Sequence, residues 1–556
     1  MNENPRNTPV VLVILDGWGI APPGEGNAIA LAKTINIDKY FATFPHSQLI
    51  ASGESVGLPK GEDGNTETGH LNIGAGKTVF QDLARINMAI AGGSFYENEV
   101  LLGAITHCRK YNSGLHLMGL IGAGGVHSNI EHLFALINLA KLNNFTKVFI
   151  HLFTDGRDSP PTSSATYVAK IRNSIKEHSL GTIASIMGRY WAMDRDHRWQ
   201  RTAKAYFALT KGKANLVKTP EEAIETSYSQ GKTDEFIEPS VVTDKNGVPV
   251  GLIKNNDAVV FFNFRTDRPR QLTKAFVSKD LAKSSLEWDF DPYAVKYEKK
   301  HISGKREASP VFERGEALSN LYFATMTEYG KPLVVAGAKV VFQKEHISQT
   351  LGQIISQNNL KQLRVSESEK EKFVTYYFSG QIEARLLGED RIIIPSPKVP
   401  TYDTKPEMSA REITNKVVEI LKAPKTYSFI LVNFANADMV AHTGNIGSTV
   451  KACEVVDECI GKLANVVLAY GGTLLISADH GNAEEMINKS TSEIDTEHST
   501  GMVPFIAISQ KFRGKSVTLP SGILADIAPT VLSLLSIQKP ENMTGRDLLK
   551  EIENIS

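Results

Sequence analysis

The sequence predicts an α/β protein with a mostly parallel central sheet, interrupted by an inserted second α/β domain. Short runs such as 10–15 and 258–262 are apolar throughout, which is typical of strands buried on both faces of a parallel sheet. Longer segments of helical character separate these runs, as in chains that alternate strands with helices. A third observation, the uneven distribution of acidic and histidine residues along the chain, indicates the insertion.

Length, charge and cysteine content limit the possible functions. The 556 residues are enough for two or more domains. Lys plus Arg and Asp plus Glu each number 61, so there is no general attraction for nucleic acid or an anionic membrane. The three cysteines form no CxxC motif, and no segment reaches the ~20 apolar residues that span a bilayer. We therefore expect a cytoplasmic protein with neither nucleic acid nor a membrane as partner.

Local patterns predict individual elements. Strands are expected at the apolar runs 10–15, 148–153, 182–187, 258–262, 374–378, 429–434, 473–477 and 503–508. Ser409-Ala-Arg-Glu412 predicts a capping box that opens a helix ending near Leu421, and 525–535 predicts a late helix packed on the sheet. Segment 288–306, rich in Lys, Tyr and Asp, is expected to be a solvated surface insertion.

Acidic residues and histidines follow three of the predicted strands near both ends of the chain. They are Asp16, Asp438, His442, Asp479, His480 and His498. A single Asp after a strand is often a turn or cap residue, and a single His is more often a structural residue than a ligand. In open α/β sheets, however, ligands gather at the carboxyl ends of strands, and three strands here end in this way. The set therefore predicts a two-metal site, the kind that transfers phosphoryl groups. Carboxylate and imidazole ligands without thiolate favour Mn²⁺, with Zn²⁺, Co²⁺ and Mg²⁺ as alternatives.

The glycine-rich segment 63–76 is the second strong signal. Its glycines and asparagines predict a tightly turned loop that presents the hydroxyl of Thr66 at its apex. A hydroxyl next to a bound metal loses its proton more readily and becomes a nucleophile. Thr66 is therefore the predicted nucleophile.

The middle of the chain, about 81–332, holds none of the candidate metal ligands and is rich in arginine near apolar runs. The simplest arrangement has one metal-binding domain made from 1–80 and 333–556, with 81–332 inserted as a substrate-binding domain. The planar guanidinium group binds phosphate and carboxylate in bidentate fashion, so these arginines indicate a small anionic substrate.

The chain resembles the cofactor-independent phosphoglycerate mutases of the alkaline phosphatase superfamily. The matching stretches include 15–19, 64–76, 125–128, 155–161, 188–190, 193–195, 263–268, 366–370, 436–442 and 477–484. The resemblance implies an alkaline-phosphatase-like metal domain and interconversion of 3- and 2-phosphoglycerate through a phosphorylated protein, without bisphosphoglycerate. It also implies a role in glycolysis and gluconeogenesis and a monomeric protein.

The resemblance further assigns roles to individual residues. One metal is held by Asp438, His442 and His498, and the other by Asp16, Asp479, His480 and the hydroxyl of Thr66. The substrate contacts are His127, Arg157, Asp158, Arg189, Arg195, Arg265, Arg268 and, from the outer domain, Lys370. Asp158 is the expected general acid/base, and the inserted domain is expected to close over the metal domain through linkers near residues 80 and 332 to exclude water.

One departure from the family keeps alternatives open. The family has Ser where this chain has Thr66, and Asp63 stands where the family usually has Met. The extra methyl group restricts χ1 and crowds the metal pocket, although the hydroxyl is retained. The alternatives are another enzyme of the superfamily, namely a phosphopentomutase, phosphatase or phosphodiesterase, or a non-catalytic protein that binds metal and phosphoglycerate.

Overall fold

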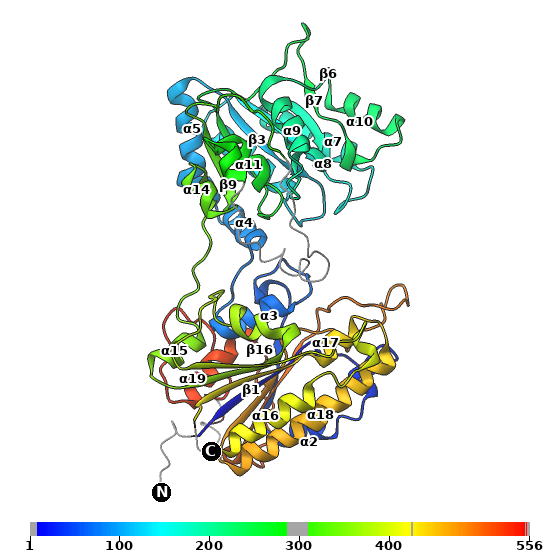
Figure 1. Cartoon of the computed structure of the whole chain (residues 1–556), viewed down its shortest axis with the longest axis vertical. Coiled ribbons are helices and arrows are strands. Elements are labelled where there is room, and N and C mark those ends of the chain that lie inside the picture. Colours follow the sequence, from blue (N-terminus) through cyan, green and yellow to red (C-terminus); the bar gives the residue numbers. More distant parts are fainter. Residues whose placement is uncertain (1–7, 286–309, 424–425, 551, 553–556) are drawn as a thin grey trace. The chain divides into compact units, whose positions relative to one another are not determined.

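The computed structural model describes residues 8–285, 310–423, 426–550 and 552, arranged as two compact units (Figure 1). Unit 1 combines Met1–Gln81 with His346–Ser556, and unit 2 is Asp82–Glu345. The boundary expected at 332 is too early, because β10 (Lys339–Phe342) pairs in parallel with β9 (Tyr322–Thr327) inside unit 2. The surface insertion expected at 288–306 lies outside the described residues.

Unit 1 is built on an eight-stranded sheet in the order β12-β11-β13-β1-β14-β15-β2-β16. Its strands are β1 (Val10–Leu15), β2 (His46–Ile50), β11 (Gln362–Glu367), β12 (Glu389–Ile394), β13 (Phe429–Phe434), β14 (Thr473–Ser477), β15 (Val503–Ser509) and β16 (Gly522–Ile523). Its helices are α1 (Ala28–Leu31), α2 (Ile35–Thr43), α3 (Thr66–Ala75), α15 (Leu351–Gln357), α16 (Ala410–Lys422), α17 (Asn436–Ala441), α18 (Ile446–Ala469) and α19 (Ile527–Leu534). The neighbouring strands β11, β13, β1 and β14 run parallel, so their carboxyl ends meet at one edge.

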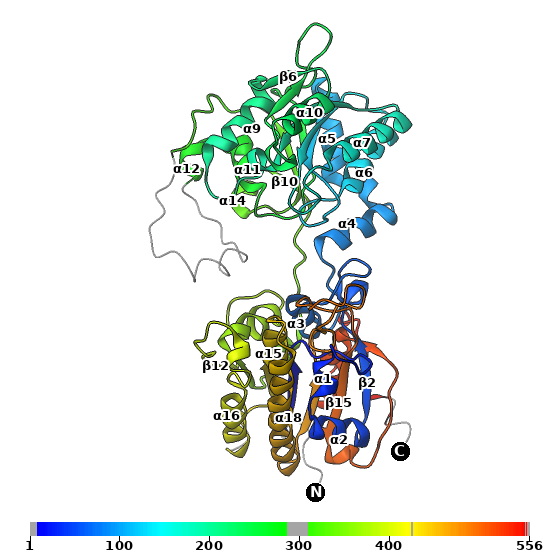
Figure 2. The same cartoon turned by 90° about the vertical axis from the view of Figure 1, so that its right-hand side faces the viewer.

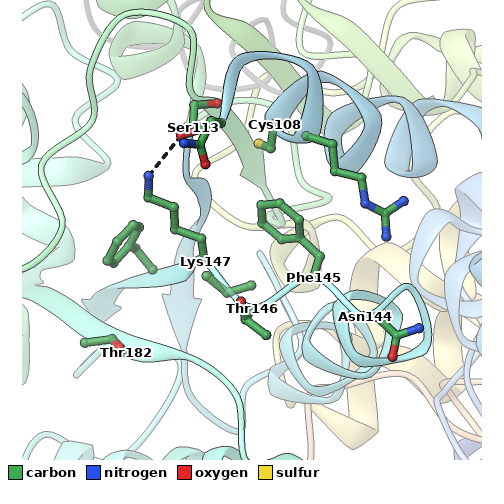
Figure 3. A pocket seen from close by; sticks show the side chains of 11 residues that line it. Cys108, Ser113, Asn144, Phe145, Thr146, Lys147 and Thr182 are labelled. Carbon is green, nitrogen blue, oxygen red and sulfur yellow. Dashed lines mark hydrogen bonds between the residues drawn. The ribbon is translucent and has the colours of Figure 1, made fainter.

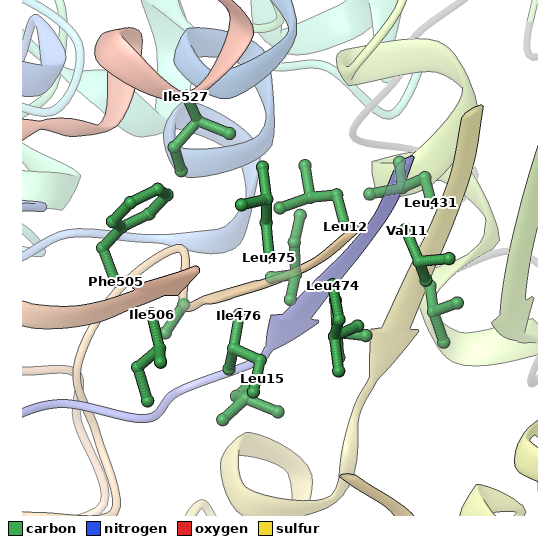
Figure 4. Packing of buried hydrophobic residues seen from close by; sticks show 14 of the residues in the cluster. Val11, Leu12, Leu15, Leu431, Leu474, Leu475, Ile476, Phe505, Ile506 and Ile527 are labelled. Carbon is green, nitrogen blue, oxygen red and sulfur yellow. The ribbon is translucent and has the colours of Figure 1, made fainter. Parts of the chain in front are cut away.

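Helices cover both faces of this sheet. Helices α2, α16 and α18 line one face, and α15 and α19 lie on the other (Figure 1). In Figure 4, Leu475 and Phe505 point toward Ile527 of α19, whereas Ile476 and Ile506 point the opposite way. All of these side chains are fully buried. Burial on both faces explains why β1 is apolar throughout and why β13 and β14 are apolar apart from Asn433, Thr473 and Ser477.

Four of the five strands expected in unit 1 are confirmed, but the one expected at 374–378 is wrong. That segment forms a π-helical turn, Phe373–Tyr377. Val374 and Phe378 are both fully buried, four residues apart, as on one face of a helical turn. The place beside β11 that this segment would fill is taken by β12. A short apolar run cannot be assigned to strand or helix by pattern alone.

The helices expected at 409–421 and 525–535 are confirmed as α16 and α19, the latter preceded by a 3₁₀ turn at Leu524–Asp526. The capping box expected for α16 is wrong. Ser409 is the N-cap residue, but its hydroxyl donates to the carbonyl oxygen of Pro395 at 2.9 Å rather than accepting from the helix.

Unit 2 repeats the same architecture with a second eight-stranded sheet, in the order β10-β9-β8-β3-β4-β5-β7-β6. Besides β9 and β10, its strands are β3 (Leu115–Ile121), β4 (Val148–Thr154), β5 (Thr182–Gly188), β6 (Asn215–Val217), β7 (Ser240–Val242) and β8 (Ala258–Phe261). Its helices are α4 (Asp82–Ala91), α5 (Glu99–Tyr111), α6 (Ile130–Leu142), α7 (Ser164–His178), α8 (Arg189–Ala192), α9 (Trp199–Lys211), α10 (Pro220–Ser229), α11 (Arg270–Val277), α12 (Leu281–Ser285) and α14 (Lys331–Val335). The strands expected at 148–153, 182–187 and 258–262 are confirmed.

Two separate apolar clusters fill the two faces of the unit 2 sheet. Helices α5, α6 and α7 lie on one face, and α9 and α11 lie on the other (Figure 2). At the amino ends of β4 and β5, a cavity of about 640 Å³ opens beside Phe145, Lys147 and Thr182 (Figure 3). Within the described residues, none of the helices is long and apolar enough to cross a membrane.

Unit 2 buries several histidines in neutral form. His116 and His151 form a chain across the sheet from Asp257 to Ser185, with contacts of 3.2, 2.9 and 2.8 Å in that order. Burial lowers the pKa of His116 and holds that of His151 well below its usual value. Burial also lowers the pKa of His132, in α6, to about 4. Protonating one of these buried rings would create a positive charge that water cannot solvate, which is unfavourable.

We predict that unit 2 loses stability as the pH falls below about 6.5. A histidine whose pKa is lower in the folded protein binds fewer protons there than in the unfolded chain. Its contribution to the free energy of unfolding is therefore complete above the ordinary histidine pKa of 6.5 and is lost as the pH falls. For His132, between pH 7 and pH 5, this amounts to roughly 2 kcal/mol. The measurement is urea unfolding at both pH values, followed by hydrogen exchange in peptides of unit 2.

The His132→Gln variant should flatten this pH dependence, because it removes the buried ring whose pKa is lowered in the folded protein. An equal loss of stability in acid for His132→Gln and the unsubstituted protein would show that His132 titrates normally.

Candidate active site

The candidate metal ligands of unit 1 meet at the carboxyl ends of four adjacent parallel strands. Asp16 directly follows β1, and Asp479 lies two residues beyond β14. Asp438 lies in α17, which begins two residues after β13, and Lys370 ends the short 3₁₀ turn after β11. Strand order therefore brings together residues that are hundreds of positions apart in sequence.

A buried ammonium group lies between two of these carboxylates. Lys370 Nζ donates to Asp16 Oδ1 at 2.6 Å and to Asp438 Oδ2 at 2.7 Å. Burial alone would lower the pKa of Lys370, but Asp16, Asp438 and the third carboxylate, Asp479, raise it well above its usual value. With all three carboxylates buried and one ammonium group beside them, the region carries excess negative charge.

The hydroxyl of Thr66 lies inside this group. Thr66 Oγ1 accepts a hydrogen bond from Lys370 Nζ at 3.1 Å and lies 2.9 Å from His480 Nε2 and 3.4 Å from Asp16 Oδ1. Burial would lower the pKa of His480, but Asp479, with Asp16 and Asp438, raises it to about 10. The predicted nucleophile is thus surrounded by the groups that the sequence assigns to the metal site.

His442 and His498 complete the arrangement around Asp438. Their Nε2 atoms lie 3.1 Å apart, and Asp438 Oδ1 lies 3.2 Å from His442 Nε2 and 3.4 Å from His498 Nε2. His442 Nδ1 faces the carbonyl oxygen of Thr496, which fixes the ring. Burial raises the pKa of Asp438, but Lys370 and the two histidines hold it well below its usual value. All seven predicted metal-site residues therefore lie in one continuous cluster.

The grouping within the cluster differs from both expected ligand sets. Asp438, His480 and His498 place their ligand atoms within 4.8 Å of one another, and Asp16, His70 and Asp479 do the same. His70 was missed by sequence reasoning. Its Nδ1 lies 3.0 Å from Asp479 Oδ2, and its Nε2 accepts from Asn433 Nδ2 at 3.2 Å.

The segment expected to be a loop around Thr66 is mostly helix. Thr66 is the first residue of α3, and Asn65 is its N-cap residue, accepting from the amide of Thr68 at 2.9 Å. His70 lies one turn after Thr66 and therefore on the same face. The sequence pattern indicated a loop at 66–76, and a loop has no such face. The spacing of Thr66 and His70 therefore did not identify His70 as part of the site.

Two glycines allow α3 to approach its neighbours closely. A Cβ atom on Gly69 would lie 2.4 Å from the carbonyl oxygen of Asp479, and one on Gly74 would lie 2.0 Å from that of Phe378.

Two side-chain amides orient the carboxylates of the site. Asn433 Nδ2 donates to Asp16 Oδ2 at 2.8 Å, and Asn482 Nδ2 donates to Asp438 Oδ1 at 2.9 Å.

The donor set fits divalent cations. Asp479 Oδ1 and the side-chain oxygens of Asn433 and Asn482 are buried and accept no hydrogen bond from the part of the chain that the structure describes. Buried acceptors with excess negative charge are unfavourable unless cations bind them. Oxygen and imidazole donors without thiolate match the ligands of Mn²⁺ and related ions.

The predicted substrate residues of unit 2 also gather at the carboxyl ends of adjacent strands. They follow β3, β4, β5 and β8, and they are His127, Arg157, Asp158, Arg189, Arg195, Arg265 and Arg268. Arg189 is central and 3% exposed. Its Nη1 donates to Asp155 Oδ1 at 2.5 Å and to Asp158 Oδ2 at 2.6 Å, and its Nη2 donates to His127 Nε2 at 2.9 Å.

Electrostatics fix the protonation states of this cluster. Burial, with the charge of Arg189, lowers the pKa of His127 to about 3, so the ring is neutral and accepts at Nε2. Burial raises the pKa of Asp158, but its bond to Arg189 outweighs this and holds the pKa below its usual value. In the free protein Asp158 is therefore a carboxylate at neutral pH.

The other arginines are oriented by carboxylates that sequence reasoning missed. Asp267 accepts from Arg195 at 2.7 Å and from Arg265 at 3.2 Å. Glu235 accepts from Arg157 Nε at 2.7 Å. Arg268 instead donates to a backbone carbonyl, and burial together with Arg189 and Arg195 lowers its pKa to about 10. This crowding of guanidinium groups creates a positive potential suited to an anion.

The fold and the two sites together define the class of protein. It is an α/β enzyme with carboxylates and imidazoles clustered in one unit and arginines clustered in the other. These two clusters suit reactions of small phosphorylated anions.

The sequence model of the family described as BPG-independent PGAM N-terminus matches residues 86–331. The chain is 47% identical over 543 residues to the 2,3-bisphosphoglycerate-independent phosphoglycerate mutase of Moorella thermoacetica, covering 98% of each chain. It is 48% identical to that of Clostridium beijerinckii, covering 97% and 99%.

The chain therefore belongs to the family of 2,3-bisphosphoglycerate-independent phosphoglycerate mutases, which are isomerases. The solved structure of Leishmania mexicana phosphoglycerate mutase at low cobalt concentration is similar, with a TM-score of 0.58, 27% identity and 97% coverage of both chains. The expected family is confirmed, and the alternatives of a different superfamily enzyme or a non-catalytic protein receive no support.

We predict that Gly69→Ala disrupts the site. The added methyl group would meet the backbone of Asp479, so α3 would have to move away from β14 and take Thr66 with it. The expected result is a loss of mutase activity of about 100-fold or more, together with a lower melting temperature. Gly24→Ala is the matched control, because nothing lies within 4 Å of its Cβ position. Full activity in Gly69→Ala would show that the close approach of α3 is dispensable.

Proposed function

We propose that the chain interconverts 3-phosphoglycerate and 2-phosphoglycerate through a covalent phosphothreonine at Thr66, with two divalent cations and without bisphosphoglycerate. The observation that carries the proposal is the position of Thr66 Oγ1, which contacts Lys370 Nζ and His480 Nε2 at the edge of three buried carboxylates. The ammonium group of Lys370, together with a cation bound beside Oγ1, would stabilise the Thr66 hydroxyl when it loses its proton.

In this proposal unit 1 binds the metal and performs the transfer, and unit 2 binds the substrate. Two cations are assigned to Asp438, His442 and His498 and to Asp16, Asp479, His480 and Thr66, respectively. When bound, they would lower the pKa of the Thr66 hydroxyl and neutralise charge on the phosphoryl oxygens. Mn²⁺ is the favoured ion, because the donor set combines carboxylate with imidazole.

The transfer consists of two displacements. Before substrate binds, Thr66 would release its hydroxyl proton to solvent. Oγ1 then attacks the phosphorus of 3-phosphoglycerate, so that the bond from phosphorus to the 3-oxygen breaks. The 2-oxygen of the retained glycerate next attacks the phosphothreonine, and the bond from phosphorus to Oγ1 breaks, which returns Oγ1 to its deprotonated form for the next turnover. Lys370 donates to Oγ1 and is placed to stabilise the charge that shifts between Oγ1 and the phosphoryl oxygens.

Asp158 carries the substrate protons in this scheme. It gives a proton to the departing 3-oxygen and takes one from the 2-hydroxyl before the second displacement. The bound substrate anion competes with Asp158 for Arg189 and raises the pKa of Asp158, so that the carboxyl is protonated when the first displacement begins. His127 is a neutral acceptor for Arg189 and acts by holding that guanidinium in place.

The arginines retain the glycerate between the two displacements. Arg189, Arg195 and Arg265 are each oriented by a carboxylate, whereas Arg268 is crowded by other guanidinium groups. A substrate that carries both a phosphate and a carboxylate offers two anionic groups to such a cluster. The cluster therefore supports a phosphoglycerate as substrate and retention of glycerate until the second displacement.

We predict that Thr66→Ala lowers mutase kcat by about 1,000-fold or more, because it removes the only atom that accepts the phosphoryl group in this scheme. The matched variant Thr66→Ser keeps the hydroxyl and should retain kcat within about tenfold. The assay uses 3-phosphoglycerate with Mn²⁺ and no bisphosphoglycerate. Full activity in Thr66→Ala would exclude Thr66 as the nucleophile.

We predict that EDTA abolishes mutase activity and that Mn²⁺ restores it better than Mg²⁺. The variant Asp479→Asn removes one buried negative charge and should lower the number of Mn²⁺ ions bound, as measured by mass spectrometry of the native protein. Activity that persists in EDTA, with no metal detected in the protein, would contradict the metal-dependent proposal.

A further inference from the structure

Asp155 is a buried carboxylate that the proposed reaction does not use. It directly follows β4 and is 2% exposed. Its Oδ1 accepts from Arg189 Nη1 at 2.5 Å and from the amides of Arg157 and Asp158, both at 3.2 Å. Its Oδ2 accepts from the hydroxyl of Ser159 at 2.9 Å. One carboxylate thus receives four hydrogen bonds from residues of a single site.

These bonds fix the turn that presents Asp158. The amides of Arg157 and Asp158 converge on one oxygen of Asp155, and Gly156, between Asp155 and Arg157, adopts φ +74°, which favours glycine. In this turn the carboxylate of Asp158 comes within 2.6 Å of Arg189 Nη1. Without Asp155, two amides would lose their acceptor, and the guanidinium group of Arg189 would lose one of its acceptors.

Asp155 also connects this turn to the loop before His127. Ser159 Oγ donates to Asp155 Oδ2 and accepts from the amide of Ala123 at 3.0 Å. A Cβ atom on Gly122 would lie 2.5 Å from Ser159 Oγ, so the loop approaches as closely as its backbone allows. The loop continues through Gly125 to His127, which accepts from Arg189.

The charge of Asp155 matters as well as its shape. The guanidinium of Arg189 is almost fully buried, and Asp155 and Asp158 share its Nη1. Because Asp155 neutralises much of that charge, Asp158 does not have to remain ionised to balance the charge of the buried Arg189. Asp158 can then exchange protons with the substrate while Arg189 stays in place.

We propose that Asp155 is a positioning residue for the mutase reaction, holding Arg189 and Asp158 in their reacting geometry without contacting the substrate. This inference rests on the proposed function, in which Asp158 carries the substrate protons. It predicts that the charge of Asp155, and not only its hydrogen bonds, affects turnover.

The test is Asp155→Asn in the full chain, because asparagine keeps the shape and the Oδ1 acceptor but removes the charge. We expect kcat to fall by about 10- to 100-fold with a smaller change in KM. We also expect the alkaline limb of kcat against pH, which the proposed reaction assigns to Asp158, to move to lower pH. Removing a neighbouring negative charge makes Asp158 lose its proton more easily.

Asp234→Asn is the matched control. Asp234 is equally buried in unit 2 and accepts from the amides of Ser163 and Ser164, but it contacts no arginine in the described part of the chain. This control should lower the melting temperature and leave kcat and the alkaline limb unchanged. The same pattern in Asp155→Asn would overturn the inference.

Two further variants keep the outcomes distinguishable. Ser159→Ala removes the donor to Asp155 Oδ2 and the acceptor of the Ala123 amide, and it should lower kcat several-fold in a folded protein. Unchanged kcat in this variant would overturn the inference even if Asp155→Asn fails to fold. If Asp158→Asn keeps full activity, the proposed proton carrier is wrong. If Asp158→Asn is inactive and Asp155→Asn is normal, the positioning role alone is wrong.

Discussion

Excess buried negative charge is the constraint on which the unit 1 site depends. Asp16, Asp438 and Asp479 are almost completely buried, and Lys370 is the ammonium group placed among them. Their field raises the pKa of both Lys370 and His480 despite burial, which shows how strongly the site favours positive charge. A site of this kind is stable only with cationic partners, and those partners stabilise charge on a nucleophile or a phosphoryl group equally well.

Parallel β-structure makes such a concentration of charge possible. In both units, four adjacent parallel strands direct their carboxyl ends to one edge, and the functional residues follow those ends directly. Opposite charges dominate the two sites: carboxylates in unit 1 and guanidinium groups in unit 2. In unit 2, Asp155, Asp267 and Glu235 hold individual arginines in place and leave the cluster cationic. The same architecture thus supports a cation site and an anion site in one chain.

Much of this could be predicted from the sequence, because buried parallel strands are apolar throughout and functional residues follow them directly. Asp16, Asp479 and His480 were identified in this way. His70 was not identified, because Thr66 and His70 lie on the same face only if the segment is a helix. The glycines of 66–76 indicated a loop instead. The strand expected at 374–378 failed because tertiary packing against α3 outweighed β propensity. Asp155 gave no signal of its own, since four hydrogen bonds to one carboxylate become visible only in three dimensions.

The most direct test of the central claim is to trap the phosphorylated protein. The holoenzyme with Mn²⁺ is mixed with ³²P-labelled 3-phosphoglycerate, quenched in acid within milliseconds, digested and analysed by mass spectrometry. The account predicts label on the peptide that contains Thr66, at that residue, formed no more slowly than 2-phosphoglycerate. Label on another residue, or rapid product formation with no labelled protein at any time, would contradict the account.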